Sequence, residues 1–358
     1  MYSLARSLLF RLDPEVAHRW VVSGIGLAGR IHPLNQYLAD AWRGRLPSYP
    51  VQAMGLTFPN PIGIAAGLDK DVQAFDGLAL FGFGFIELGT VTPLPQSGNP
   101  KPRMFRLTAK HALINRMGFN SKGLNHFLGQ LQRTEQSAVT GINLGKNATT
   151  PVEEAAQDYI SGLRAAYSVA DYVTINISSP NTKDLRTLQE DVALDHLLDA
   201  LKEEQHNLTQ RHQKYTPIVL KIAPDLNDPQ LNHIANALMQ HEIDGVIATN
   251  TTISRPQAIS GHRHAGEAGG LSGRPLAPLS REKVAALRER LPSSFPIIGV
   301  GGIDDADSAN AMLSAGANLL QVYTGLIYRG PTLLRSILSG INHTALRSSQ
   351  SSKEKDHP

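Results

Sequence analysis

Polar side chains of a narrow chemical range recur at the ends of short apolar runs. They are mostly amides, hydroxyls and lysines, accompanied by glycines: Gly67, Asp69, Lys70, Thr90, Asn143, Asn176, Ser178, Ser179, Asn181, Lys221, Thr249, Asn250, Thr251, Gly299, Gly301, Gly302, Tyr323, Thr324 and Gly325. Amides both donate and accept hydrogen bonds, which suits a flat heterocycle with imide and carbonyl groups. The two ammonium groups suit anionic groups on a ligand.

Other chemistries lack the residues that they need. Carboxylates and histidines are nearly absent from these positions, which disfavours a metal site and hydrolysis by paired carboxylates. The pair His262 and His264 lies in a long loop, and we expect no metal there. Ser179 has no histidine–aspartate partner in a nucleophile elbow, which disfavours acyl transfer. The chain contains no cysteine, so a cysteine nucleophile and an iron–sulfur cluster are excluded.

Eight apolar runs alternate with helical patterns and must position these side chains. The runs are rich in isoleucine and valine and do not alternate with polar residues, as in parallel strands buried on both faces. They span 62–66, 85–90, 138–144, 172–177, 218–222, 245–249, 297–300 and 318–323. Eight strand–helix units predict an α/β fold, a (β/α)8 barrel whose active site lies at the carboxyl ends of the strands. A doubly wound open sheet is less favoured, because AAGLDKD at 65–71 lacks its glycine fingerprint.

The last two runs end in glycine-rich segments. GVGGI spans 299–303 and YTGLIYRGP spans 323–331. Phosphate sites of such barrels use backbone N–H groups at these two strand ends. Together the segments suggest a phosphorylated cofactor or substrate. The two long connections, at about 91–138 and 250–279, are expected to be lids and ligand loops.

The first 45 residues differ from the rest. Leucines recur at near-helical spacing, and Asp13-Pro14 then begins a second helix as N-cap and first residue. Its apolar stripe comprises Ala17, Trp20, Val21, Gly24, Ile25 and Ala28. These amphipathic helices either cap the main domain or form a membrane-surface platform. We therefore predict a small two-helix extension at 1–45, a barrel domain at 46–345 and a polar, disordered tail at 346–358.

Charge and hydropathy exclude further classes. Lysine and arginine total 34 against 31 aspartates and glutamates, a net charge of +3 that is too weak to indicate nucleic-acid binding. No apolar run approaches the ~20 residues of a membrane-spanning helix. Charged residues interrupt the N-terminal apolar pattern, so we expect no signal peptide.

Several long motifs together resemble the dihydroorotate dehydrogenase family across nearly the whole chain. They are AAGLDKD at 65–71, IELGTVTPLPQSGNPKPRMFRL at 86–107, NRMGFN at 115–120, GINLGKN at 141–147, TINISSPNT at 174–182, VLKIAPDL at 219–226, VIATNTT at 246–252, GGLSGRPL at 269–276 and IGVGGI at 298–303. The lack of cysteine excludes the cysteine-dependent class. Ser179 and the N-terminal helices resemble the quinone-dependent, membrane-associated class, class 2.

The resemblance implies an enzyme (EC 1.3.5.2) that oxidises (S)-dihydroorotate to orotate in pyrimidine biosynthesis. One FMN per chain and a quinone as electron acceptor are implied. A peripheral place on the cytoplasmic face of the inner membrane is implied as well. Substrate contacts carry over to Lys70, Asn115, Arg116, Met117, Gly118, Phe119, Asn176, Asn181, Asn250 and Thr251. FMN contacts carry over to Ala66, Gly67, Leu68, Asp69, Lys70, Thr90, Asn143, Asn176, Lys221, Thr249, Gly273, Gly302, Tyr323 and Thr324. Candidate quinone contacts are His18, Arg106 and Tyr323.

In this interpretation Ser179 is the general base at C5, and FMN N5 takes the hydride from C6. Lys70 and Lys221 would stabilise developing negative charge. Alternatives remain open on the residues alone. Ser179 could cap a turn, and His18 could be a helix-interface residue. Lys221, which needs a partner inside an apolar strand, could be the Schiff-base lysine of a barrel lyase. A non-catalytic membrane-docked binding protein is the third class.

Overall fold

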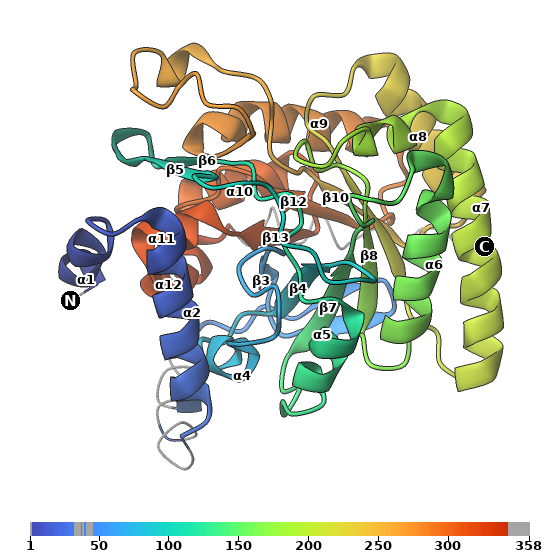
Figure 1. Ribbon diagram of the computed structural model, residues 1–358, viewed down its shortest axis with the longest axis horizontal. Coiled ribbons are helices and arrows are strands. Elements are labelled where there is room, and N and C mark those ends of the chain that lie inside the picture. The colour runs from blue at the N-terminus through green and yellow to red at the C-terminus, as the bar shows by residue number, and fades with distance from the viewer. Residues whose placement is uncertain (1, 32–36, 38, 41–45, 343–358) are drawn as a thin grey trace.

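The computed structural model describes residues 2–31, 37, 39, 40 and 46–342. Its centre is a closed barrel of eight parallel strands in the order β10-β12-β13-β3-β4-β7-β8-β9 (Figure 1). The strands are β3 (Ile62–Ile64), β4 (Phe85–Val91), β7 (Val139–Leu144), β8 (Tyr172–Asn176), β9 (Ile218–Ile222), β10 (Gly245–Ala248), β12 (Ile297–Val300) and β13 (Leu319–Val322). All eight lie within or almost within the runs expected to be strands. The predicted barrel is thereby confirmed.

The barrel interior is filled by large side chains that stand opposite glycines. A Cβ on Gly63 would lie 2.4 Å from the Phe85 ring, and one on Gly141 would lie 2.2 Å from the Tyr172 ring. Phe85 and Tyr172 pack edge to face at 6.3 Å, and Phe58 packs on Phe85 at 5.3 Å. Only glycine leaves room for rings of this size inside eight strands.

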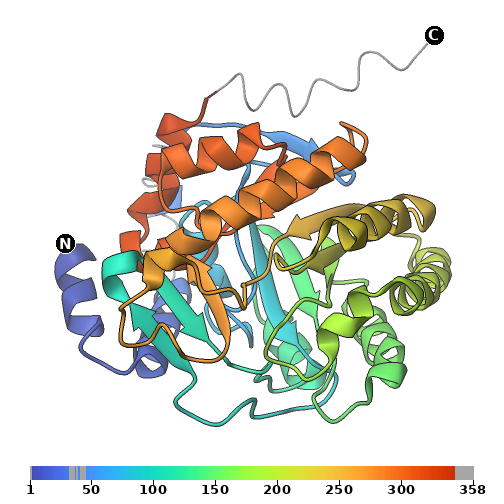
Figure 2. The same ribbon diagram turned by 90° about the horizontal axis from the view of Figure 1, so that it is seen from above.

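Helices surround the strands (Figure 2) and bury their apolar faces against them. They are α4 (Phe75–Ala79), α5 (Leu124–Leu131), α6 (Ala155–Ala166), α7 (Asp191–His212), α8 (Asp228–Gln240), α9 (Ala277–Arg290), α10 (Ala306–Ser314), α11 (Thr324–Arg329) and α12 (Thr332–Gly340). Short 3-10 helices span Thr108–Lys110, Val152–Glu154, Leu185–Gln189, Gln257–Ile259 and Arg274–Leu276. The start of α8 shows how local sequence sets a boundary, because Asn227 and Gln230 form a reciprocal capping box.

Two small sheets were not predicted from the sequence. Strands β1 (Val51–Ala53) and β2 (Leu56–Phe58) form a hairpin. Strands β5 (Met104–Leu107), β6 (Ala112–Asn115) and β11 (Gly270–Gly273) form an antiparallel sheet in the order β11-β6-β5. The second sheet joins the two long connections that were expected to be loops. It pairs Asn115 with Gly270 and so fixes the register of two segments that are far apart in sequence.

The N-terminal segment forms two helices, α1 (Tyr2–Leu9) and α2 (Pro14–Gly29), beside the barrel (Figure 1). Asp13 caps α2 as expected, since its carboxylate accepts hydrogen bonds from the backbone N–H groups of Glu15 and Val16 at 2.9 and 3.1 Å. No helix among the described residues is long and apolar enough to cross a membrane.

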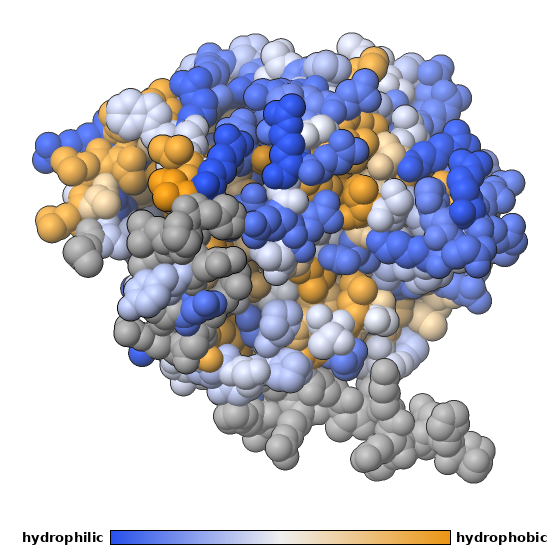
Figure 3. All heavy atoms as spheres, turned by 90° about the horizontal axis from the view of Figure 1, so that it is seen from below, coloured by the Kyte–Doolittle hydropathy of each residue, from blue (hydrophilic) through white to orange (hydrophobic). Residues whose placement is uncertain are grey.

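The predicted apolar stripe of α2 divides between two faces. The side facing the barrel contains Glu15, Ala17, Val22, Gly26 and Gly29. Trp20 is 64% exposed, and Leu4 and Leu8 on α1 are likewise exposed. Figure 3 shows hydrophobic residues gathered at the side of the molecule where these helices lie. The sequence pattern did not separate the two faces, because small residues rather than large ones make the close contact with α4. The predicted boundary at 45 and the tail at 346–358 lie outside the described residues.

Candidate active site

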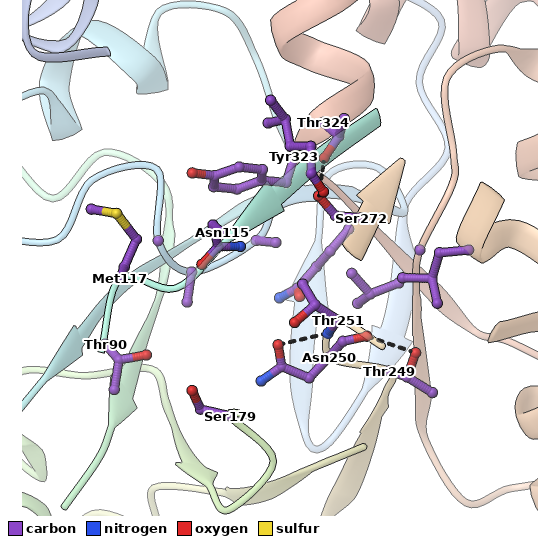
Figure 4. Close-up of a pocket in the computed structure, with 18 of the residues that line it drawn as sticks. Thr90, Asn115, Met117, Ser179, Thr249, Asn250, Thr251, Ser272, Tyr323 and Thr324 are labelled. Atoms are coloured by element: carbon purple, nitrogen blue, oxygen red, sulfur yellow. Dashed lines mark hydrogen bonds between the residues drawn. The ribbon is translucent and has the colours of Figure 1, made fainter. Parts of the chain in front are cut away.

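A cavity opens at the carboxyl ends of the barrel strands, where the site was expected (Figure 4). It encloses about 1110 Å³, a volume that includes its open mouth. Most of the predicted site residues line it: Ala66, Gly67, Lys70, Thr90, Asn115, Met117, Gly118, Phe119, Asn176, Ser179, Asn181, Lys221, Thr249, Asn250, Thr251, Gly273, Gly302, Tyr323 and Thr324. The barrel thus brings together residues from the ends of seven of its eight strands, all except β7, and from β6.

Four predicted residues lie behind the cavity wall or turn away from it. Leu68 is a buried core residue. Asp69 accepts hydrogen bonds from the backbone N–H groups of Gln73 and Ala74, both at 2.8 Å, and burial raises its pKa. Arg116 turns outward to Glu267, at 2.7 Å. These contacts give Asp69 and Arg116 evident structural partners.

Asn143 is the fourth predicted residue outside the cavity lining, and it is hydrogen-bonded to two residues that line the cavity. Its Oδ1 accepts hydrogen bonds from the Thr90 hydroxyl at 2.5 Å and from Asn176 Nδ2 at 3.0 Å. Asn250 Nδ2 in turn donates to the Ser178 hydroxyl at 3.0 Å. Amides and hydroxyls on neighbouring strand ends therefore form one connected network. Such a network orients each member before a ligand arrives.

Ser179 lies in the loop after β8, on the opposite side of the opening from Tyr323 (Figure 4). It is buried, and its Oγ accepts a hydrogen bond from the backbone N–H of Asn181 at 3.3 Å. Within the described residues no histidine or carboxylate bonds to this hydroxyl. The described contacts of Ser179 are not those of a serine-hydrolase triad.

Two lysines bring positive charge to the cavity. Lys70 Nζ donates to Asn120 Oδ1 at 2.5 Å. Burial, and to a smaller extent the charge of Arg103, lower the pKa of Lys70 to about 8. Lys221 is 5% exposed, and its Nζ lies 3.7 Å from Glu87 Oε1. The partner that Lys221 was expected to need is therefore supplied by the chain itself.

Backbone glycines form the wall near the last two strands. Gly301 and Gly302 have φ angles of +127° and +73°, a region that other residues rarely adopt. A Cβ on Gly302 would lie 2.4 Å from Ala277 Cβ. The Thr324 hydroxyl lies beside these glycines in the cavity lining and donates to Ser272 Oγ at 2.9 Å. Exposed backbone N–H groups and a hydroxyl suit a phosphate group.

Comparison with known proteins identifies the family. The family model described as dihydroorotate dehydrogenase matches residues 49–345. A protein of Burkholderia multivorans named dihydroorotate dehydrogenase (quinone) is 54% identical over 341 residues, which cover 95% of this chain and 97% of that protein. A Burkholderia thailandensis protein of the same name is also 54% identical over 341 residues and 95% of this chain. The chain belongs to the dihydroorotate dehydrogenase family.

Solved structures agree. The crystal structure of the Eimeria tenella enzyme in complex with ferulenol matches with a TM-score of 0.80 at 38% identity, over 92% of this chain and 90% of that one. The resemblance found in the sequence, to the quinone-dependent class of dihydroorotate dehydrogenases, is confirmed. The chain is thus a flavin-dependent oxidoreductase of pyrimidine biosynthesis that oxidises dihydroorotate and uses a quinone. The barrel-lyase alternative is not favoured.

The three candidate quinone residues lie on different elements. His18 is on α2, and burial and the charge of Lys70 lower its pKa to about 4, so it is neutral at pH 7. Arg106 on β5 donates to the carbonyls of Phe10 and Leu12 at 3.3 and 2.8 Å, and it lies over the Phe10 ring at 4.7 Å. Tyr323 lines the cavity itself. Arg106 therefore has a visible role in holding the connection between α1 and α2.

The sequence analysis missed two polar residues inside the barrel. Glu87 is fully buried in β4, and Gln321 in β13 lines the cavity. The signal that could have found them is a charged or amide residue within an otherwise apolar run. Among the described residues, no group of three or more His, Cys, Asp or Glu is arranged to hold a metal ion.

Proposed function

We propose that this family member binds one FMN in the cavity and oxidises (S)-dihydroorotate to orotate with Ser179 as the general base. The observation that carries the proposal is the convergence of Ser179, the amide network and two lysines beside a glycine-rich wall. Neither the hollow lined by Gly26, Phe75 and Gln130 nor the one lined by Val152, Asp191 and Gln230 contains a lysine.

The residues present fit FMN. A phosphate would meet the backbone of Gly273 and Gly302 and the Thr324 hydroxyl, while Ala66, Gly67 and Thr249 would flank the ring system. Gln321 Oε1 is buried and has no hydrogen-bond partner among the described residues, so an N–H group on a bound ring would satisfy it. When bound, FMN supplies a hydride acceptor, which side chains cannot provide.

The substrate would lie over Ser179, held by amides on several elements. The cavity is lined by Asn115, Asn176, Asn181 and Asn250, whose amides supply the donors and acceptors that a pyrimidine ring with two amide-like edges requires. Lys70 would pair with a carboxylate or with the carbonyl next to C5. Met117, Gly118 and Phe119 would close over the ring from the segment that follows β6.

The Ser179 hydroxyl would accept the proton leaving C5. A neutral hydroxyl is a weak base, and its Oγ already accepts one hydrogen bond from Asn181 N–H. The proton must therefore pass on to a water molecule, while the ammonium group of Lys70 stabilises the negative charge that develops on the ring. A base of this kind contributes about 10²–10⁴-fold to the rate.

The quinone would reach the cavity from the side of α1 and α2. These helices expose Leu4, Leu8, Trp20 and Leu27 to solvent, an apolar surface that suits the membrane interface. We propose that residues 1–45 form a quinone-access domain on the 46–345 barrel. The protein would then sit peripherally on the cytoplasmic face of the inner membrane, with His18, Arg106 and Tyr323 along the quinone path.

The purified protein tests this proposal directly. It should be yellow, release FMN on denaturation in a ratio near one per chain, and bleach when dihydroorotate is added without a quinone. Adding a quinone should restore the colour. A colourless preparation that FMN cannot reconstitute would refute the cofactor assignment. A yellow preparation that dihydroorotate fails to bleach would refute the placement of the substrate beside the flavin.

A further inference from the structure

A single carboxylate lies at the centre of the barrel, beneath the cavity. Glu87 on β4 has no solvent exposure. Its Oε1 accepts a hydrogen bond from Asn143 Nδ2 at 2.8 Å, and its Oε2 accepts one from Gln321 Nε2 at 2.7 Å. The Tyr172 and Thr174 hydroxyls donate to Oε2 as well, both at 3.2 Å. With Lys221 Nζ 3.7 Å from Oε1, five side chains surround this one group.

Burying a charged carboxylate costs folding free energy, so its presence calls for a role that an apolar side chain could not fill. A buried ion pair contributes little to stability compared with well-packed apolar residues, because both charges lose their hydration. The barrel interior around Glu87 already contains close-packed rings, among them Phe85 and Tyr172. Packing alone therefore gives no reason for a carboxylate at this position.

Three of the five neighbours connect Glu87 to the cavity. Lys221 and Gln321 line the cavity directly. Asn143 is connected to the cavity indirectly. Its Oδ1 accepts hydrogen bonds from the Thr90 hydroxyl and the Asn176 amide, and both of those residues line the cavity. A change at Glu87 would therefore reach the cavity by three separate routes.

A carboxylate also fixes the orientation of the side-chain amides that contact it. It has no proton to donate, so only the NH₂ end of Asn143 or Gln321 can face it. The carbonyl end of each amide must then point away from Glu87. For Asn143 that end accepts from Thr90 and Asn176, and for Gln321 it is the buried Oε1 that no described residue satisfies.

We propose that Glu87 is a positioning residue that fixes the hydrogen-bond polarity and the net charge of the cavity floor. It turns Gln321 Oε1 toward the ligand as an acceptor, orders the Asn143–Asn176–Thr90 network, and balances the charge of Lys221. The FMN ring system is the ligand that would contact this floor, so the inference rests on the proposed function. Glu87 itself touches neither the flavin nor the substrate.

The test is the reduction potential of bound FMN in Glu87→Gln, compared with that of the unaltered protein at the same pH. Gln removes the negative charge but keeps the size of the side chain. The ammonium group of Lys221 then acts uncompensated on the electrons that the flavin takes up, so the potential should shift to more positive values. FMN affinity should also fall about tenfold, because an amide cannot accept from both Asn143 and Gln321.

Tyr172→Phe is the matched control. It removes one donor from the same carboxylate, keeps every charge, and changes a residue that does not line the cavity. Its potential should equal that of the unaltered protein. A potential in Glu87→Gln that equals the unaltered one, or a shift in Tyr172→Phe as large as in Glu87→Gln, would overturn the proposal.

Glu87→Asp covers the case in which Glu87→Gln does not fold. It keeps the charge but withdraws the carboxylate by one methylene, so the potential should stay near the unaltered value while FMN affinity falls. Unaltered affinity in Glu87→Asp would overturn the proposal. Failure of the proposed function and failure of this inference give different results. If the unaltered protein binds no FMN, the proposed function fails. If the unaltered protein binds FMN and the Glu87 variants match it in FMN affinity and reduction potential, only the role of Glu87 is refuted.

Discussion

Ser179 is the residue on which the proposed chemistry depends most directly. It is buried, its hydroxyl has one described partner, and no carboxylate or histidine is among the described residues that line the cavity. Removing the hydroxyl leaves the glycine-rich wall and the lysines unchanged. The effect should therefore fall on proton transfer and not on cofactor binding.

Ser179→Ala should lower kcat by about 10²–10⁴-fold, the usual contribution of a positioned general base. FMN content and the visible spectrum should stay as in the unaltered enzyme, because no expected cofactor contact is lost. The effect is measured by steady-state turnover and by the rate at which the flavin absorbance bleaches after dihydroorotate is added. A variant that turns over within a factor of two of the unaltered enzyme would show that another group takes the proton.

Lys70 should make ligand binding depend on pH. Its pKa is lowered to about 8, so the free enzyme loses this positive charge as the pH rises through 8. The affinity for the anionic product orotate should be constant below pH 7 and fall about tenfold per pH unit above 8. Titration of the flavin absorbance with orotate measures it.

Lys70→Arg is the control for that pH profile. A guanidinium group stays charged throughout the range, so the decline above pH 8 should disappear even if the affinity is lower overall. A decline of the same steepness in Lys70→Arg would assign the titration to a different group.

Lys221 illustrates what residue-level reasoning could and could not predict. Its place in an apolar run required a partner, which is a statement of solvation energy and needs no structure. The identity of the partner was not accessible, because Glu87 lies on β4 and Lys221 on β9. In the closed barrel β7 and β8 stand between those two strands, so the ion pair crosses the interior.

At the scale of elements, α2 is attached to the barrel by one strong polar contact and two glycines. Arg103 donates to both oxygens of Glu15, at 3.1 and 2.8 Å, and holds the pKa of Glu15 below its ordinary value. A Cβ on Gly26 or Gly29 would lie 2.1 Å from Gln73 O or 2.5 Å from Gly77 N. The helix can therefore lie close to α4 only with these residues in place.

Glu15→Gln should loosen α2, because Arg103 would lose a buried charged partner. Opening of the helix should become about tenfold more frequent, which corresponds to the loss of one such hydrogen bond. The same loosening should appear in the unaltered protein as the pH falls below roughly 4, since a lowered carboxylate pKa stabilises the fold only while the group is ionised. Limited proteolysis within 14–29 measures both.

Lys101→Ala provides the comparison for α2. Lys101 lies 3.2 Å from the same carboxylate, but its side chain is 56% exposed, and exposed ion pairs contribute little. Proteolysis of this variant should match the unaltered protein. Equal cleavage rates in Glu15→Gln and the unaltered protein would show that the glycine contacts alone hold the helix.

The barrel strands were predictable and the small antiparallel sheets were not, for a physical reason. Parallel strands buried on both faces form apolar runs that stand out from polar surroundings. The strands β5 and β11 have four residues each and include arginine, serine or glycine. Their pairing depends on β6, which joins them only after the two long connections meet in three dimensions. Local sequence therefore does not predict the pairing of these strands.

At the scale of the whole molecule, α1 and α2 expose apolar side chains on the side of the barrel where they lie (Figure 3). Trp20→Glu and Leu27→Glu change side chains that are 64% and 66% exposed, so neither should destabilise the fold. Both should reduce binding to lipid vesicles and slow turnover with a membrane-embedded quinone. Turnover with a water-soluble electron acceptor should be unchanged. Flotation with vesicles and paired assays measure these effects.

Val192→Glu is the matched control, because Val192 on α7 is 69% exposed and lies on the other side of the barrel from α1 and α2 (Figure 1). It should affect neither vesicle binding nor quinone turnover. If it reduces vesicle binding as much as Trp20→Glu does, the membrane contact is not specific to the N-terminal helices.

The docking of α1 has a consequence for how the protein is made. The Tyr2 hydroxyl donates to the carbonyl of Ile327 at 2.5 Å, and Arg6 donates to that of Tyr328 at 2.8 Å. A ribosome synthesises these partners more than 300 residues apart, and β3 cannot complete its pairing until β13 has emerged. Helix α1 can therefore dock on the barrel only after nearly the whole chain has been translated.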